Sequence, residues 1–96
     1  MKLRVLMVED DPDIRWSLGA DGRDAGCEVC EAATLAAGRA ALVQEPDLIL
    51  RDLALPDGDG QTLLTEALQR HPGQMVIVMS GHAKLERAVE MMAQGA

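Results

Sequence analysis

The sequence predicts an α/β fold built on a doubly wound parallel sheet, and two observations lead to this prediction. Four short strand-like runs, at residues 3–8, 28–32, 47–52 and 75–79, alternate with segments of helical periodicity. The runs are largely apolar at consecutive positions, which is typical of strands covered on both faces. Such strands are joined by right-handed crossovers, and their functional crevice lies beyond their carboxyl ends.

The first strand–helix unit carries clear boundary signals. Asp11 follows the first strand as an N-cap candidate, Pro12 takes the first helical position and Asp13 places an acid in the first turn. The helix is expected to reach about Ala25, where Gly26 ends it.

Inside this helix, Gly19 and Gly22 each weaken it by roughly 1 kcal/mol relative to alanine, so its stability must come from packing. Trp16 lies roughly 160 to 200° around the helix from Ile14 and Leu18. We therefore expect Trp16 to be partly exposed.

The second unit has a strand at about residues 28–32, followed by Thr34 as the cap of a helix that runs to Val43. Glu45-Pro46 then breaks the chain before the third strand. Cys27 directly precedes this strand and Cys30 lies within it. Positions three apart on a strand point to opposite faces, so we expect structural thiols and no redox pair.

The third helix begins after Gly60 and is stopped by His71-Pro72-Gly73. The fourth strand, residues 75–79, leads into a last helix with Gly95 as its C-cap. One face of that helix is apolar and consists of Leu85, Ala88, Val89 and Met92.

Composition limits the class of protein. The 96 residues are expected to form one domain, 1–96, and an apolar content of 48% with 26% charged residues is that of an ordinary globular chain. No apolar stretch approaches the roughly 20 residues of a membrane span and none resembles a signal peptide, so we expect a cytoplasmic protein without membrane contact. The net charge of −7 disfavours direct contact with nucleic acid.

Carboxylates follow two of the strands. Glu9-Asp10-Asp11 comes directly after the first strand, and Asp52 ends the third. If these strands are neighbours, about 4.8 Å apart in a parallel sheet, the acids converge on one point. Convergent carboxylates predict a site for a hard cation.

Three separated motifs together resemble the receiver domain of a bacterial two-component response regulator. Val8-Glu9-Asp10-Asp11 resembles the acidic pair of that family, Asp52-Leu-Ala-Leu-Pro56 with Gly60 resembles its phosphoacceptor segment, and Val78-Met79-Ser80-Gly81 resembles its hydroxyl switch strand. The resemblance covers the whole chain. It implies a flavodoxin-like sheet of strand order 2-1-3-4-5, with four of the usual five βα units present.

The resemblance also implies a role for each site residue. Asp52 would accept a phosphoryl group from a sensor histidine kinase or a small donor such as acetyl phosphate. Asp10 and Asp52 would bind Mg²⁺ directly, with the main-chain carbonyl of Ala54 as a third ligand and Glu9 acting through water. Ser80 would donate a hydrogen bond to the phosphoryl group and so switch the domain.

The implied function is phosphorelay signal transduction by a phosphoacceptor that is not an enzyme. Its output would be carried by a domain or partner not in this chain, with transcription regulation as the expected process. Ile14-Arg15-Trp16 and Ser80-Gly81-His82 resemble nitrogen-regulator-type members, whereas the stretch from Leu55 to Gly60 resembles winged-helix members. We favour the first type.

One departure from the family pattern keeps other functions open. The family lysine after a fifth strand is absent, because the chain stops at Ala96. A pseudo-receiver that acts only through protein contacts is therefore an alternative. A chain ending there would leave residues 75–79 as an apolar edge strand, so we expect self-association, for example as a homodimer.

Two further classes fit the site residues less well. A Mg²⁺-dependent aspartyl-phosphate phosphatase needs a second carboxylate two residues after the nucleophile, where Ala54 stands. A flavin mononucleotide binder needs a hydroxyl-rich loop after the first strand, whereas Glu9-Asp10-Asp11 would repel phosphate.

Overall fold

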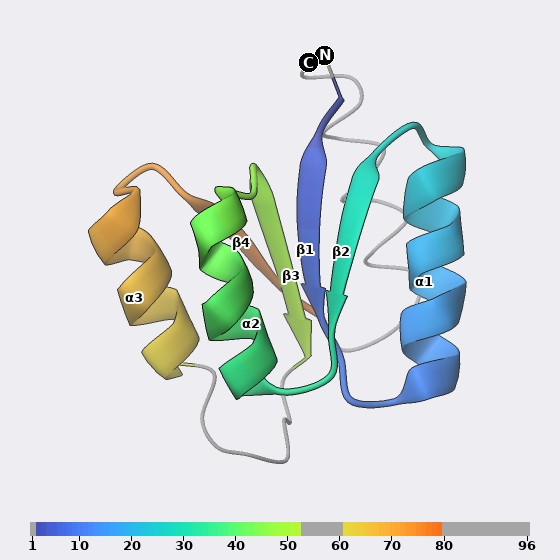
Figure 1. Cartoon of the computed structure of the whole chain (residues 1–96), viewed down its shortest axis with the longest axis horizontal. Coiled ribbons are helices and arrows are strands. Elements are labelled where there is room, and N and C mark those ends of the chain that lie inside the picture. The colour runs from blue at the N-terminus through green and yellow to red at the C-terminus, as the bar shows by residue number, and fades with distance from the viewer. Residues whose placement is uncertain (1, 53–60, 80–96) are drawn as a thin grey trace.

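The computed structural model describes residues 2–52 and 61–79. Over these ranges the chain forms one four-stranded sheet with helices packed against both of its faces (Figure 1). The strands are β1 (Arg4–Val8), β2 (Glu28–Ala32), β3 (Leu48–Asp52) and β4 (Met75–Met79). The helices are α1 (Pro12–Asp24), α2 (Leu35–Ala41) and α3 (Gln61–Arg70), and a short 3-10 helix, η1 (Leu42–Gln44), extends α2.

The four strands are parallel and lie in the order β2-β1-β3-β4. This arrangement confirms the α/β fold class and the predicted contact between the first and third strands. The sheet is doubly wound, because the chain moves from β1 outward to β2 and then returns past β1 to β3 and β4 (Figure 1). Val8, at the end of β1, lies opposite Ala32 on one side and Arg51 on the other.

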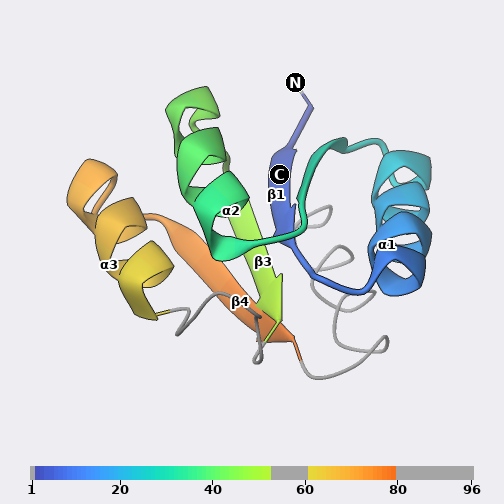
Figure 2. The same cartoon turned by 60° about the horizontal axis from the view of Figure 1, so that its bottom comes forward.

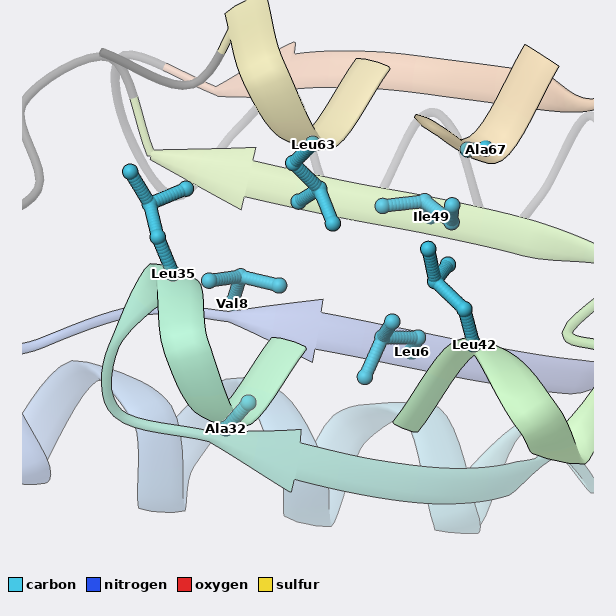
Figure 3. Packing of buried hydrophobic residues seen from close by; sticks show 8 residues of the cluster. All are labelled: Leu6, Val8, Ala32, Leu35, Leu42, Ile49, Leu63 and Ala67. Carbon is cyan, nitrogen blue, oxygen red and sulfur yellow. The ribbon is translucent and has the colours of Figure 1, made fainter. Parts of the chain in front are cut away.

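Helix α1 covers one face of the sheet, and helices α2 and α3 cover the other (Figure 2). On the first face, Leu18 of α1 packs with Val5 and Met7 of β1 and with Leu48 and Leu50 of β3. Alternate positions of β1 serve the second face, which explains why this strand is apolar throughout. The cluster on the second face, drawn in Figure 3, consists of Leu6, Val8, Ala32, Leu35, Leu42, Ile49, Leu63 and Ala67.

The two cysteines belong to different faces. Cys27 packs against the cluster under α1, whereas Cys30 packs against the cluster under α2 and α3. This confirms the expected separation of the thiols. Burial raises the pKa of the Cys27 thiol, as expected for a thiol that packs against the core.

Helix α1 separates its faces as the periodicity predicts. Leu18 is 1% exposed and Trp16 is 74% exposed. Trp16 is thus more exposed than the partial exposure that we expected. None of the described helices is long and apolar enough to cross a membrane.

The second helix ends earlier than its sequence predicts. Thr34 caps it through its side chain, as expected, but the α-helix stops at Ala41 instead of Val43 and tightens into η1. Pro46 limits how far the helical segment can continue, because a residue that precedes proline is disfavoured in the right-handed helical region. Glu45 ends η1 with a left-handed φ of 55°.

Two helical glycines allow the helices to approach the sheet closely. A Cβ at Gly22 would lie 2.9 Å from Cγ2 of Val29, and one at Gly38 would lie 2.9 Å from Cγ2 of Val8. Packing against the sheet therefore explains why glycine, a residue of low helix propensity, occupies these two positions. Gly26 serves another purpose, since its φ of 89° turns the chain out of α1 toward β2.

Several predicted features lie outside the described residues. These are the last helix with Leu85 and Met92, the expected third ligand Ala54 and the switch residue Ser80. They stay predictions, as does the expected self-association.

Candidate functional site

The acidic loop, Glu9-Asp10-Asp11, joins β1 to α1 and directs its three carboxylates into different surroundings. Asp11 caps α1, because its Oδ1 accepts hydrogen bonds from the backbone N–H groups of Asp13 at 2.9 Å and Ile14 at 3.2 Å. Asp10 is exposed. Glu9 is 4% exposed and is the one charged side chain buried among the described residues.

The burial of Glu9 is unusual for a carboxylate. Its backbone N–H donates a hydrogen bond of 2.9 Å to the carbonyl of Ala32, so the start of the loop is tied to β2. Removing a carboxylate from water costs several kcal/mol unless charge or hydrogen bonding compensates, so such residues are rare in interiors. A buried acid at the carboxyl end of a central strand therefore marks a candidate site.

Three strand ends meet at this edge of the sheet. Val8 of β1 pairs with Arg51 of β3, and Glu9 and Asp52 are the next residues of the two chain segments after this pair. Asp52 in turn pairs with Met79, the last residue of β4. The ends of β1, β3 and β4 thus lie side by side, as the convergence of the carboxylates requires. The side chain of Asp52 lies outside the described part of the structure.

Arg15 of α1 reaches back over the acidic loop, and the sequence analysis missed this role. Its Nη1 donates hydrogen bonds to the main-chain carbonyls of Glu9 at 2.8 Å and Asp10 at 3.4 Å. Its Nε lies 3.7 Å from Oε1 of Glu31 on β2. A signal was available, because a cation in the first turns of a helix opposes the helix dipole and needs another reason to be there.

A cavity of the described structure lies away from the acidic loop. A cavity of about 780 Å³ opens at the amino ends of the strands, next to Arg4 and Gly26. The acidic loop lies at the carboxyl ends of the strands and does not line this cavity. The cavity therefore does not define the candidate site, and we base the site on the carboxylates and their register.

The site residues suit a hard cation in their chemistry. Among the described residues, no three potential metal-binding side chains gather in one place. The predicted ligand set of Asp10, Asp52, Ala54 and Glu9 includes side chains and segments beyond those residues, so it stays a prediction. Carboxylate and carbonyl oxygens are the donors that Mg²⁺ takes, and two acids at adjacent strand ends fit that requirement.

Comparison with known proteins gives a consistent result. The sequence matches the family model described as response regulator receiver domain over residues 5–96. It is 39% identical over 93 residues to the DNA-binding transcriptional regulator NtrC of Escherichia coli K12, which covers 96% of this chain and 20% of that protein. It is 34% identical over 94 residues to the response regulator protein PilR of Pseudomonas aeruginosa, covering 97% of this chain and 21% of that protein.

The chain therefore spans about a fifth of the length of the curated relatives that it matches. Among solved structures, it is similar to a response regulator receiver domain protein from Methanospirillum hungatei, with a TM-score of 0.78 and 36% identity. That match covers 97% of this chain and 76% of the other. The similarity to NtrC agrees with the nitrogen-regulator type that the sequence analysis favoured.

Proposed function

The chain belongs to the response regulator receiver domain family, and on that premise we propose that Asp52 accepts a phosphoryl group in two-component signalling. The observation that carries this proposal is the register of β1 and β3, in which Glu9 and Asp52 follow the paired residues Val8 and Arg51. The burial of Glu9 supports it, because burying a carboxylate is costly and such groups cluster at functional sites.

Members of this family bind Mg²⁺ in general. We assign the cation to the carboxylates of Asp10 and Asp52 and to the main-chain carbonyl of Ala54, with Glu9 acting through water. When bound, the cation offsets the repulsion between carboxylate and phosphoryl oxygens. The exposure of Asp10 supports this assignment, since a partly hydrated cation needs a ligand that solvent can reach.

Asp52 supplies the nucleophile for phosphoryl transfer. One of its carboxylate oxygens forms a bond to phosphorus while the phosphorus–nitrogen bond of a phosphohistidine on a sensor histidine kinase breaks. The imidazole leaves with the electron pair of that bond. With acetyl phosphate as the donor, the phosphorus–oxygen bond breaks and acetate leaves. The chain thus acts as a phosphoacceptor, and it is not an enzyme with a separate substrate.

Ser80 responds to phosphorylation by donating a hydrogen bond to the phosphoryl group on Asp52. A phosphoryl group adds nearly two negative charges and three acceptor oxygens at Asp52. In the sequence, Ser80 directly follows Met79, the strand residue that pairs with Asp52, and this supports Ser80 as the donor to the new acceptors. A hydrogen bond made only after transfer converts the chemical change into a conformational one.

The similarity to NtrC and PilR supports an output in gene regulation. We propose that this output, in the cytoplasm, is carried by a domain or partner distinct from the receiver. The receiver itself would then contact the kinase and the output module, with no direct contact to nucleic acid.

Phosphorylation at Asp52 can be tested by incubating the chain with Mg²⁺ and acetyl phosphate, followed by intact-mass and peptide mass spectrometry. We expect label on Asp52 and none in Asp52→Asn. Asp24→Asn is a matched control, because Asp24 is an exposed carboxylate at the end of α1. Label elsewhere, or equal labelling of Asp52→Asn, would refute the proposal.

Metal binding is tested separately by calorimetry. Asp10→Ala should abolish Mg²⁺ binding because it removes a direct ligand, whereas Glu9→Gln should only weaken it. Asp24→Asn should bind as the parent does. Equal affinities for the parent chain and Asp10→Ala would contradict the ligand assignment. A parent chain that shows no Mg²⁺-linked change would favour the pseudo-receiver.

A further inference from the structure

Arg15 holds the acidic loop through its main chain. The guanidinium donates to the carbonyls of Glu9 and Asp10, and it is only 21% exposed on its side chain. These carbonyls belong to the two peptide units on either side of the Asp10 Cα, from which the Asp10 side chain departs. Their orientation therefore sets the direction in which the Asp10 carboxylate leaves the backbone.

Glu31 keeps the guanidinium in this position. Its Oε1 lies 3.7 Å from Nε of Arg15, while its Oε2 accepts a hydrogen bond of 2.9 Å from Arg23. Gly19 leaves the space that this carboxylate occupies, because a Cβ there would lie 3.0 Å from Oε2 of Glu31. Helix α1 thus has a glycine at the position against which the Glu31 carboxylate lies as it pairs with Arg15 and Arg23.

The contacts form a continuous path from β2 to the acidic loop. Arg23 holds Glu31, Glu31 orients Arg15, and Arg15 holds the carbonyls of the loop. The other end of the loop is held by Asp11, whose side chain caps α1.

We infer that Arg15 is a positioning residue for the cation site, acting on Asp10 through the main-chain carbonyls of the loop and oriented by Glu31. This inference rests on the proposed function, because it concerns the Mg²⁺ assigned there. Outer contacts that orient metal ligands typically contribute 10- to 100-fold to metal affinity. Arg15 acts through the backbone, so we expect about the lower end of that range.

The sign of the effect separates positioning from simple electrostatics. Arg15 is a cation beside a cation site, so its charge alone opposes Mg²⁺. Removing that charge would strengthen binding if electrostatics dominated. Loss of positioning would weaken binding, because the ligand groups would lose conformational entropy each time Mg²⁺ binds.

The test measures Mg²⁺ affinity of the 96-residue chain by calorimetry, with metal-free thermal melts as a check on folding. We expect Arg15→Gln to weaken binding about tenfold. Arg15→Lys keeps the charge but cannot contact the loop and Glu31 with one planar group, so it should also weaken binding, by severalfold. An unchanged or higher affinity in Arg15→Gln would overturn the inference, as would an unchanged affinity in Arg15→Lys.

A double mutant tests the path through Glu31. Glu31→Gln should weaken binding about threefold, and Arg15→Gln/Glu31→Gln should bind no worse than Arg15→Gln, because Glu31 acts through Arg15. Additive losses in the double mutant would contradict that path. Arg39→Gln is the matched control. Like Arg15→Gln, this variant loses one positive charge and an ion pair, here the 2.6 Å pair between Arg39 and Glu66. Its affinity should stay within about twofold of the parent chain.

The outcomes distinguish this inference from the proposed function. If the parent chain binds Mg²⁺ and Asp10→Ala does not, the site stands and the Arg15 variants decide the positioning role alone. If neither the parent chain nor Asp10→Ala binds, the proposed function fails and the positioning role fails with it.

Discussion

Gly38 of helix α2 lies against Val8 of strand β1, and its replacement by alanine tests how tightly the sheet is packed beneath the site. The Cβ of an alanine would lie 2.9 Å from Cγ2 of Val8 and 3.5 Å from its Cγ1. Val8 is fully buried and lies between β2 and β3 in a central strand. Its β-branched side chain has few rotamers to choose from, so the backbone must yield.

Two opposing terms set the magnitude for Gly38→Ala. Alanine gains about 1 kcal/mol over glycine inside a helix. Overpacking a well-filled core typically costs about 1–3 kcal/mol. The expected result is a net destabilisation of about 1 kcal/mol, or a melting temperature lower by about 4–8 °C for a domain of this size.

Urea unfolding followed by circular dichroism measures this change, and Gly73→Ala is the matched control. A Cβ at Gly73 meets no atom within 4 Å, so that variant should be neutral or slightly more stable. Adding Val8→Ala to Gly38→Ala should recover about 1 kcal/mol relative to the sum of the single variants, because the new methyl fills the space that Val8 vacates. A Gly38→Ala variant as stable as the parent chain, or strict additivity, would refute this account of the packing.

Two further predictions concern Gly26 and Cys27. Gly26→Ala should cost about 1 kcal/mol of unfolding free energy in urea, because φ is 89° and no neighbouring atom hinders the methyl; an unchanged stability would contradict a conformational origin. Burial raises the pKa of the Cys27 thiol, so its alkylation rate should reach half-maximum at a higher pH in the folded chain than in urea. The same shift stabilises the fold below the thiol's ordinary pKa, and this contribution is lost as pH rises through the folded pKa; a folded midpoint at or below the unfolded one would refute the burial argument.

Local chemistry explains why much of the fold can be predicted from the sequence. The caps at Asp11 and Thr34 satisfy N–H groups within three residues of themselves, so the residues that make the contact are also neighbours in the sequence. Pro46 and Gly26 end elements through their own backbone restrictions. The strands follow from their apolar runs, and the acids at Glu9 and Asp52 are visible as the residues that follow those runs.

Strand order is not local in this sense. Nothing in residues 3–8 or 47–52 specifies which strand becomes a neighbour, and the predicted contact between them depended on resemblance to a known family. The structure supplies the register, in which Val8 pairs with Arg51, and with it the common level of the two acids.

The sequence by itself determined the order and type of the elements and the acids at their ends, because those depend on periodicity, caps and turns over a few residues. Only the tertiary structure decided that Arg15 contacts the acidic loop, that Glu31 lies against Gly19 and that Gly38 meets Val8. These contacts depend on the rotation of each helix about its axis and on its distance from the sheet. Both are set by side chains far apart in the sequence, which pack only when the whole core has formed.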